Sequence, residues 1–462
     1  MRRTLGDFAQ ACDGRLTGAD RPYAAVSTDS RSVKSGELFV ALKGPRFDGA
    51  EFVGAAAAAG AAGAVVGGAL VPEAQAPALS QIVVADAQIA LARASNRWRE
   101  QWAIPIIGVA GSNGKTTAKE MTAAILSQVG NCLATRGNLN NHIGVPLTLF
   151  RLEQQHRFAV VEMGANHPGE VAELVEIARP TIGLITNAGA EHLEGFGTLE
   201  GVARAEGEMV AGLAADATAV INADDPFAPL WRGLTRARVL TFGITEPADF
   251  AARGIEADIT SGEFRTRFTL QCALGSVPIE LKLAGRHNVA NALAAAAAAT
   301  AAGADLTAVR SGLAAMRPVQ GRLELKRARS GAWIIDDSYN ANPSSMRAGI
   351  EVLADLDGRK WLVVGDMAEL GAAAESSHVE IGSLARARGI ERLFATGQLT
   401  QLAVESFGPG AKWYPDSEAL ARTLDADAGP EVRMLIKGSR VNRLERVVAA
   451  LIAPPPHATG GG

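Results

Sequence analysis

Residues 104–120 read IPIIGVAGSNGKTTAKE, and they predict a buried strand, a glycine loop and the start of a helix. The apolar run Ile104–Ala110 is typical of a strand inside a parallel sheet. Gly111 and Gly114 let the backbone bend so that its N–H groups point inward, and N–H groups at a helix N-terminus attract phosphate. The stretch therefore predicts an α/β protein with a phosphate-binding loop at the end of a strand.

The spacing of this loop differs from the usual pattern G-x-x-x-x-G-K-[ST], because Val109 stands where the first glycine belongs. Lys115 would still reach the β- and γ-phosphates of a nucleotide, and Thr116 would bind Mg²⁺. A glycine turn without a ligand is the alternative. The strand before the loop, the helix after it and the sequence GKTT together favour the phosphate loop.

The bulk composition suits a multidomain α/β protein. The chain has 462 residues, 48% of them hydrophobic and only 5% aromatic, with 50 glycines. This length predicts about three domains.

The net charge of −4 argues against a nucleic-acid-binding protein. Cys12, Cys132 and Cys272 show no metal or disulfide spacing, which predicts buried thiols in a reducing compartment. The charged N-terminus and the lack of a long, strongly apolar run predict a cytoplasmic protein without membrane insertion.

The strand and helix patterns divide the chain into three blocks and a tail. We predict domains at residues 1–85, 86–318 and 319–454, and a disordered tail at 455–462. The second and third blocks alternate strands with helices, which predicts a doubly wound, mainly parallel sheet and then a Rossmann-like domain. Residues 263–283 alternate apolar and polar side chains around ALGS, which predicts a small antiparallel sheet.

Polar residues follow several predicted strands at the edge where ligands bind in such sheets. Glu162 ends the apolar run FAVVE, and its carboxylate suits Mg²⁺. His192 follows the strand Thr181–Asn187 and falls at the same edge. A solvated strand end and a structural histidine remain the alternatives. Residues 336–345, DDSYNANPSS, could bind a sugar or could form an Asx-turn loop, and the residues alone do not decide between these.

Motifs along the whole chain resemble those of the Mur ligase family, which builds the peptide of bacterial peptidoglycan. The motifs include STDSRSVKSGELFVALKG (27–44), GSNGKTT (111–117), GNLNNHIGVPLT (137–148), EHLEGFG (191–197), GRHNVANALAA (285–295), GRLE (321–324), DSYNANPSSM (337–346) and IKGSR (436–440). The family also carries a shortened phosphate loop of the form GTNGKT, which accounts for Val109.

The resemblance implies a UDP-binding N-terminal α/β domain, a central ATP-binding domain and a C-terminal ligase domain. It implies an ATP-dependent ligase that joins D-alanyl-D-alanine to UDP-N-acetylmuramoyl-tripeptide through an acyl phosphate, as the final cytoplasmic step of peptidoglycan precursor synthesis. A monomer that binds no nucleic acid is expected.

Other functions fit the sequence less well. The motifs DSYNANPSSM and EHLEGFG argue against the sister ligase that adds one amino acid to a UDP-muramoyl dipeptide. Residues 1–110 leave room for a UDP-binding domain, which argues against folylpolyglutamate synthetase. A nucleotide-binding regulator does not need Lys115, Glu162 and His192 together, and a nucleic-acid motor needs a basic stripe that the chain lacks.

The resemblance also implies roles for residues at matching positions. The ATP phosphates would be bound by Gly111, Ser112, Asn113, Gly114, Lys115, Thr116 and Thr117. Asn288 and Asn291 would lie near adenine, Arg322 near the γ-phosphate and Asp337 near the ribose. The first of two Mg²⁺ ions would be bound by Thr116 and Glu162, and the second by His192. UDP would be bound by Ser30, Arg31, Lys43 and Gly44. The diphosphate and sugar would pass Asn138, Asn140 and Asn141, and the dipeptide pocket would be formed by Tyr339, Asn340 and Asn342.

Glu206 departs from the family pattern. Its segment GVARAEGEMV resembles one that reads A-K-G-E, in which the lysine is carbamylated by CO₂ and helps to bind the second Mg²⁺. A glutamate is a permanent carboxylate, but its reach is shorter by roughly 3–4 Å. We hypothesise that Glu206 takes the carbamate's catalytic and metal-binding role, without a need for bicarbonate. The alternative is a weaker second metal site with Glu206 in solvent.

Overall fold

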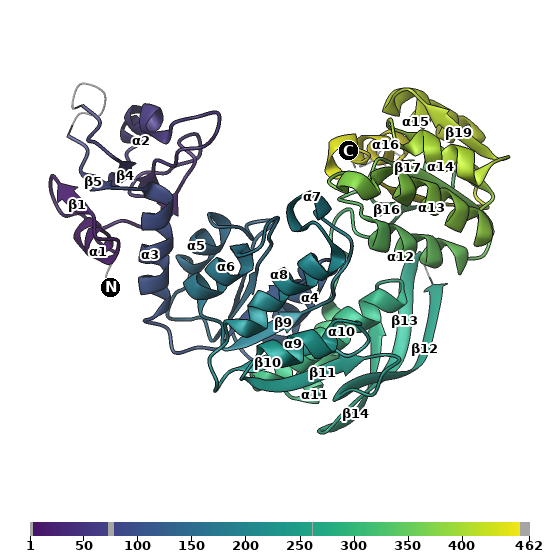
Figure 1. Ribbon diagram of the computed structural model, residues 1–462, viewed down its shortest axis with the longest axis horizontal. Helices are drawn as coiled ribbons and strands as arrows, with labels where there is room; N and C mark the ends of the chain where they lie inside the picture. The colour runs from purple at the N-terminus through teal and green to yellow at the C-terminus, as the bar shows by residue number, and fades with distance from the viewer. Residues whose placement is uncertain (1–2, 73–77, 261, 453–462) are drawn as a thin grey trace, which may run out of the picture.

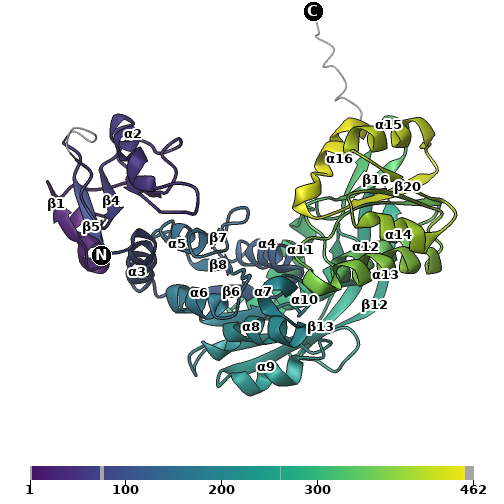
Figure 2. The ribbon, with the colours of Figure 1, turned by 45° about the horizontal axis from the view of Figure 1, so that its top comes forward.

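The computed structural model describes residues 3–72, 78–260 and 262–452, which form three sheets in three consecutive domains. The N-terminal domain and the C-terminal domain lie at opposite ends, with the phosphate-loop domain between them (Figures 1 and 2). The predicted tail at 455–462 lies outside the described residues. Within those residues, none of the helices combines the length and apolar character that a membrane crossing requires.

The N-terminal domain contains a five-stranded sheet of order β1-β5-β4-β3-β2, in which only β1 is antiparallel to its neighbour. Its elements are α1 (Leu5–Ala11), β1 (Arg15–Thr17), β2 (Val26–Ser27), β3 (Leu38–Val40), α2 (Val53–Ala58), β4 (Gly63–Gly67) and β5 (Gln81–Val84). The next helix, α3 (Ala87–Arg99), begins where the Asp86 side chain accepts the N–H groups of Gln88 and Ile89. It packs on the middle domain, since Asn96 donates to the carbonyl oxygen of Ile177.

The middle domain is built on one nine-stranded sheet of order β14-β13-β12-β11-β10-β9-β6-β8-β7. Its strands are β6 (Ile106–Ala110), β7 (Cys132–Ala134), β8 (Phe158–Glu162), β9 (Ile182–Ile185), β10 (Thr218–Asn222), β11 (Arg238–Gly243), β12 (Phe250–Thr260), β13 (Glu263–Cys272) and β14 (Gly275–Leu281). Its remaining helices are α4 (Lys115–Leu126), α5 (Gly144–Leu149), α6 (Glu170–Ala178), α7 (Leu193–Phe196), α8 (Leu199–Ala211), α9 (Ala228–Leu234), α10 (Arg286–Ala301) and α11 (Leu306–Ala315).

The predicted parallel sheet and the predicted antiparallel hairpin are both confirmed, but they belong to the same sheet. Strands β6 to β11 are mutually parallel, while β12, β13 and β14 pair antiparallel. Strand β12 joins the two parts, because its first residues pair in parallel with the end of β11. The three strands β6, β8 and β9 are buried along their whole length, which fixes the edge from which the phosphate loop leaves the sheet.

The C-terminal domain has the predicted Rossmann-like alternation of strands and helices. Its sheet has the order β15-β16-β20-β17-β18-β19, and only β15 is antiparallel to its neighbour. The elements are β15 (Glu324–Arg327), β16 (Trp333–Asp337), α12 (Pro343–Ala354), β17 (Arg359–Gly365), α13 (Ala374–Ala387), β18 (Arg392–Thr396), α14 (Thr400–Phe407), β19 (Ala411–Tyr414), α15 (Ser417–Asp427), β20 (Val432–Lys437) and α16 (Glu445–Leu451). The three-domain α/β fold is therefore confirmed, while the domain boundaries stay predictions.

Candidate active site

A cavity of about 700 Å³ lies where the middle and C-terminal domains meet. Its wall includes the ends of β6, β8 and β9 on one side and the segment from β16 to α12 on the other. The predicted residues that line this cavity are Ser112, Asn113, Gly114, Lys115, Thr116, Thr117, Asn138, Asn140, Asn141, Glu162, His192, Asn288, Asn291, Arg322, Asp337, Tyr339, Asn340 and Asn342. The fold thus brings the predicted residues at 112–192 to the same cavity as those at 337–342, which lie more than 100 positions later in the sequence.

The phosphate loop uses its backbone N–H groups in two ways. The N–H of Gly111 donates to Glu206 at 2.6 Å, and those of Ser112 and Asn113 donate to Asn187 at 2.9 and 3.0 Å. Within the described residues, the next four N–H groups, 114–117 at the start of α4, make no hydrogen bond. A helix N-terminus leaves such donors free for an anion. That residues 111–117 bind phosphate stays a prediction, and in this arrangement the N–H groups of the second half of the loop are the ones available to an anion.

Gly114 is required by its conformation and by its neighbour. Its φ of 83° lies in the left-handed region, and a Cβ there would overlap the side chain of Asn291. Asn291 donates to Asn288, and both amides are buried on α10 at the edge of the cavity. Burial, with a smaller effect from Lys437, lowers the pKa of nearby His287 to about 4, so its imidazole is neutral at physiological pH. The buried amides of Asn288 and Asn291 and the neutral imidazole of His287 therefore offer uncharged hydrogen-bonding groups at this end of the cavity.

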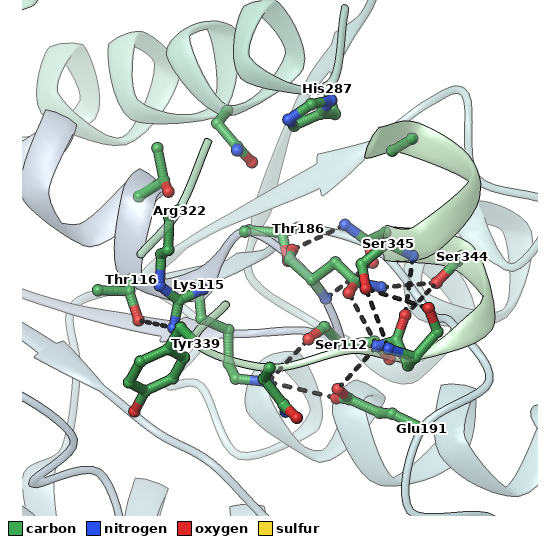
Figure 3. A pocket seen from close by; sticks show the side chains of 18 of the residues that line it. Ser112, Lys115, Thr116, Thr186, Glu191, His287, Arg322, Tyr339, Ser344 and Ser345 are labelled. Atoms are coloured by element: carbon green, nitrogen blue, oxygen red, sulfur yellow. Dashed lines mark hydrogen bonds and ion pairs between the residues drawn. The ribbon is translucent and has the colours of Figure 1, made fainter. Parts of the chain in front are cut away.

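Lys115 is surrounded by carboxylates. Its Nζ lies 3.3 Å from Glu191 Oε1 and donates to the carbonyl oxygens of Gly111 and Ser112 (Figure 3). Burial lowers the pKa of Lys115, but Glu191, Glu206 and Glu162 raise it by more, so the net pKa lies above its ordinary value. The lysine is consequently a fixed positive charge at the start of α4.

Glu206 is neither in solvent nor in the cavity. It is 4% exposed on α8 and lies beneath the loop, where its Oε2 accepts the N–H of Gly111. Burial raises its pKa to about 7, with Lys115 acting in the opposite direction. The alternative that places Glu206 in solvent is therefore wrong, while its proposed metal-binding role stays a hypothesis, with Oε2 bound to the loop backbone in this structure.

We expect Glu206→Gln to stabilise the protein at pH 8 and to have little effect at pH 4. With a folded pKa of about 7 and an ordinary value of 4.5, the folded state keeps a proton that the unfolded state releases. Stability therefore falls as pH rises through this range, by about 3 kcal/mol in total, and glutamine removes that loss. The measurement is the thermal unfolding temperature of both proteins at the two pH values. Exposed Glu200→Gln is the control, and an unchanged pH dependence in Glu206→Gln would contradict the assignment.

Glu162 has the surroundings of a cation ligand. It is 2% exposed, its Oε1 accepts an N–H of Asn140 at 2.9 Å, and its Oε2 lacks a partner within the described residues. A buried carboxylate oxygen without a partner is costly, and a hard divalent cation would satisfy it. Glu162 and the Thr116 hydroxyl line the same cavity, so these residues fit the first predicted Mg²⁺.

The expected partners of the second Mg²⁺ do not come together. His192 Nδ1 contacts a carboxylate oxygen of Glu369 in the C-terminal domain, whereas Glu206 contacts the loop backbone. Among residues 3–72, 78–260 and 262–452, no three His, Cys, Asp or Glu side chains converge as a metal site. The pair His192 and Glu206 is therefore not a preformed metal site in this arrangement.

Arg322 brings the C-terminal domain onto the phosphate loop. Its Nη2 donates to Thr116 Oγ1 at 3.2 Å, and its guanidinium carbon lies 4.5 Å from the centre of the Tyr339 ring (Figure 3). Asp337, the predicted ribose ligand, is held by Lys437 at 2.6 Å. Burial raises the pKa of Asp337, and Lys437 acts against this rise. The predicted γ-phosphate arginine is thus next to the loop, while Asp337 is engaged by a lysine.

The N-terminus of α12 forms a second contact between the two domains. Asn342 caps this helix by accepting the N–H of Ser345, and its Nδ2 donates to Asn113 Oδ1 at 2.9 Å. Asn113 Nδ2 in turn donates to Ser344 Oγ at 2.8 Å. Because a phosphate-loop residue and a C-terminal helix cap share these bonds, the cavity is complete only when both domains are in contact.

The predicted UDP residues do not line the cavity. Arg31 pairs with Asp29 at 2.8 Å, Lys43 pairs with Asp48 at 3.3 Å, and Gly44 donates to the carbonyl oxygen of Phe47. With Ser30, they belong to the N-terminal domain, which Figure 1 shows apart from the C-terminal domain. Their predicted role therefore concerns a distant part of an extended substrate.

Several polar residues of the cavity were not predicted from the sequence, among them Glu191, Lys437 and Ser344. Glu191 contacts Lys115 and lies 3.4 Å from Asn342 Nδ2, Lys437 holds Asp337, and Ser344 binds Asn113. Each lies inside a quoted motif, EHLEGFG, IKGSR or DSYNANPSSM, so the motifs contained a signal. Their roles depend on contacts between distant segments, which the motifs do not reveal.

Comparison with known proteins agrees with this geometry. The chain matches the family descriptions "Mur ligase family, catalytic domain" over residues 22–99, "Mur ligase middle domain" over 109–299 and "Mur ligase, glutamate ligase domain" over 321–440. It is 44% identical to the UDP-N-acetylmuramoyl-tripeptide–D-alanyl-D-alanine ligase of Escherichia coli, over 97% of this chain and 98% of that protein.

Two solved structures are also similar. MurF from Acinetobacter baumannii has a TM-score of 0.90 and 34% identity, over 97% of this chain and 98% of that one. MurF from Thermotoga maritima in complex with ADP has a TM-score of 0.80 and 27% identity, over 92% and 96%. Family descriptions, sequence identity and structure thus agree over nearly the whole length, and the chain belongs to the Mur ligase family.

Proposed function

We propose that this protein is an ATP-dependent ligase that joins D-alanyl-D-alanine to the free carboxyl end of UDP-N-acetylmuramoyl-tripeptide. The observation that carries the proposal is the single cavity shared by the phosphate loop and the C-terminal segment 337–342. Similarity to the Escherichia coli ligase over nearly all of both chains supports the choice of substrates. A monomer acting in the cytoplasm on this UDP-linked precursor, as predicted from the sequence, belongs to the same proposal.

The reaction needs an activated carboxyl group, because a carboxylate is a poor electrophile. The tripeptide carboxylate oxygen attacks the γ-phosphorus of ATP, ADP leaves, and an acyl phosphate forms. The dipeptide amine, after losing a proton to solvent, attacks the acyl carbon, and inorganic phosphate leaves with one oxygen of the former carboxylate. Enzymes of phosphoryl transfer act mainly through alignment and charge neutralisation.

The residues of the cavity suit these two tasks. Lys115 and the free N–H groups at the start of α4 provide positive charge and donors for the phosphates. Arg322 lies beside Thr116, where it can approach the γ-phosphate. Thr116 and Glu162 would hold one Mg²⁺, whose charge would offset the repulsion between the carboxylate and ATP.

Asn288 and Asn291 remain the proposed adenine contacts, and Ser30, Arg31, Lys43 and Gly44 remain the proposed UDP contacts. A second Mg²⁺ at His192 stays a prediction.

We expect phosphate release from ATP to require both UDP-muramoyl tripeptide and D-alanyl-D-alanine. Oxygen-18 in the donor carboxylate should appear in the released phosphate, because that oxygen leaves with phosphorus in the second step. The measurement is a coupled phosphate assay with each substrate omitted in turn, followed by mass spectrometry of the phosphate. Ligation of single amino acids to a UDP-muramoyl dipeptide, with no reaction of D-alanyl-D-alanine, would instead identify the sister activity.

A further inference from the structure

A second cavity of about 230 Å³ adjoins the first, between the middle and C-terminal domains. Glu191, His192, Tyr339 and Asn340 line both cavities, so the two spaces share a wall. Arg440 lines only the second cavity, at its unshared side. A small molecule in this space would have one end next to the proposed phosphate site and the other end next to an arginine.

Two arginines contact the ring of Tyr339, and each of them lines a different cavity. The guanidinium carbon of Arg322 lies 4.5 Å from the centre of the Tyr339 ring, and that of Arg440 lies 5.4 Å from it. Arg322 lines the first cavity and not the second, so each cavity has its own cation against the same ring. A ring in contact with a guanidinium attracts and positions it by cation–π interaction.

The backbone below Arg440 is held in place, whereas its side-chain donors are free. The preceding residue, Ser439, donates through Oγ to the carbonyl oxygen of Ala341 at 3.1 Å and accepts the N–H of Ala368 at 2.9 Å. Within the described ranges of the chain, the Arg440 guanidinium makes no ion pair or hydrogen bond, and the residue is exposed. A guanidinium offers a planar set of donors that matches a carboxylate.

The shared wall has the opposite charge. Glu191 contributes a carboxylate that is only 10% exposed and faces Lys115 at 3.3 Å. Glu369 also lines the second cavity, but it is paired with His192. Within the described residues, the space therefore has an arginine without an ion pair at its outer side and, where it joins the first cavity, a carboxylate that is shared with Lys115.

We infer that the second cavity binds the acceptor dipeptide with its terminal carboxylate on Arg440 and its amine toward Glu191 and the first cavity. This inference rests on the proposed function, because it supplies that reaction with an orientation for its second substrate. The attacking nitrogen must lie next to the acyl carbon, so the amine belongs at the shared wall. Arg440 is then a specificity-determining residue, because its guanidinium binds the free carboxylate of the acceptor.

The test compares two acceptors, D-alanyl-D-alanine and D-alanyl-D-alaninamide, on wild-type enzyme and Arg440→Gln. The amide lacks the terminal charge, so the wild-type KM for the acceptor should be roughly 10- to 100-fold higher with it, the usual worth of a charged hydrogen bond. Arg440→Gln should raise the KM for the dipeptide by a similar factor and bind both acceptors equally, with the KM for ATP unchanged. Arg446→Gln, an exposed arginine on α16 that lines neither cavity, should discriminate like the wild type.

The outcomes separate this inference from the function on which it rests. A wild-type enzyme that uses both acceptors equally well, or an Arg440→Gln variant that keeps the wild-type preference for the free carboxylate, would overturn the inference alone. A wild-type enzyme that joins neither acceptor would overturn the proposed function, and this inference with it. The wild-type comparison needs no variant, so it gives an answer even if Arg440→Gln folds poorly.

Discussion

Lys115→Met is expected to lower kcat/KM for ligation by roughly 10³-fold, since removing one donor aimed at developing charge commonly costs about 10²- to 10³-fold. The larger value is expected because Lys115 provides a full charge and is held at the phosphate loop by Gly111, Ser112 and Glu191. Methionine keeps the length and apolar stem of the side chain. The measurement is the steady-state rate of phosphate release with both substrates saturating and with ATP varied.

The control for this variant is Lys412→Met, which removes an exposed lysine of β19. Thermal unfolding checks that Lys115→Met remains folded. The loss of the cation leaves Glu191, Glu206 and Glu162 close to one another, but Glu206 already has a pKa of about 7 and can take up a proton. A variant that changes only the KM for ATP and keeps the wild-type kcat would show that Lys115 binds the nucleotide without stabilising the transition state.

Glu162→Gln is expected to raise the Mg²⁺ concentration needed for half-maximal rate by more than roughly 100-fold. Changing a group that merely supports a metal ligand already costs about 10- to 100-fold in affinity, and Glu162 is proposed as a ligand itself. Glutamine can keep the hydrogen bond with Asn140, so the fold should survive while the anionic oxygen is lost. The measurement is the rate as a function of Mg²⁺ concentration at saturating ATP.

A second readout does not depend on turnover. Mn²⁺ binding in the presence of ADP, followed by electron paramagnetic resonance, should weaken in Glu162→Gln and stay unchanged in Glu153→Gln, an exposed carboxylate before β8. Equal Mn²⁺ affinity in wild type and Glu162→Gln would exclude Glu162 as a ligand. In that case its Oε2, which has no partner within the described residues, needs another explanation.

Much of the fold could be predicted because the buried strands have strong local patterns. Strands β6, β8 and β9 are continuous apolar runs that stay buried at every position. Strands β1, β2, β7, β12, β15 and β19 were not predicted. Arg253, Glu256 and Asp258 interrupt β12, and the other five are edge strands of two to four residues. Such strands depend on their partners in the sheet more than on their own residues.

The site was predictable where a motif fixes the local backbone and less so where two domains meet. The strand, loop and helix around Lys115 follow from the order of glycines and apolar residues. The contacts of Asn342 with Asn113 and of Glu191 with Lys115 join residues separated by 229 and 76 positions. Glu206 shows a further limit: its residue type was read correctly, but only packing decides that it reaches Gly111 instead of the cavity.

The proposed UDP residues lie in the N-terminal domain, at the opposite end of the molecule from the C-terminal domain (Figure 1), so the length of the donor would decide whether its acid end reaches Lys115. If the uridine end is gripped by the first domain, the reacting acid must span the remaining length to Lys115. A peptide shorter by one residue would end as much as about 3.6 Å too early, farther than a reacting oxygen can be from phosphorus. Incomplete precursors would then fail to react because they are too short, even if no residue of the protein contacted their side chains.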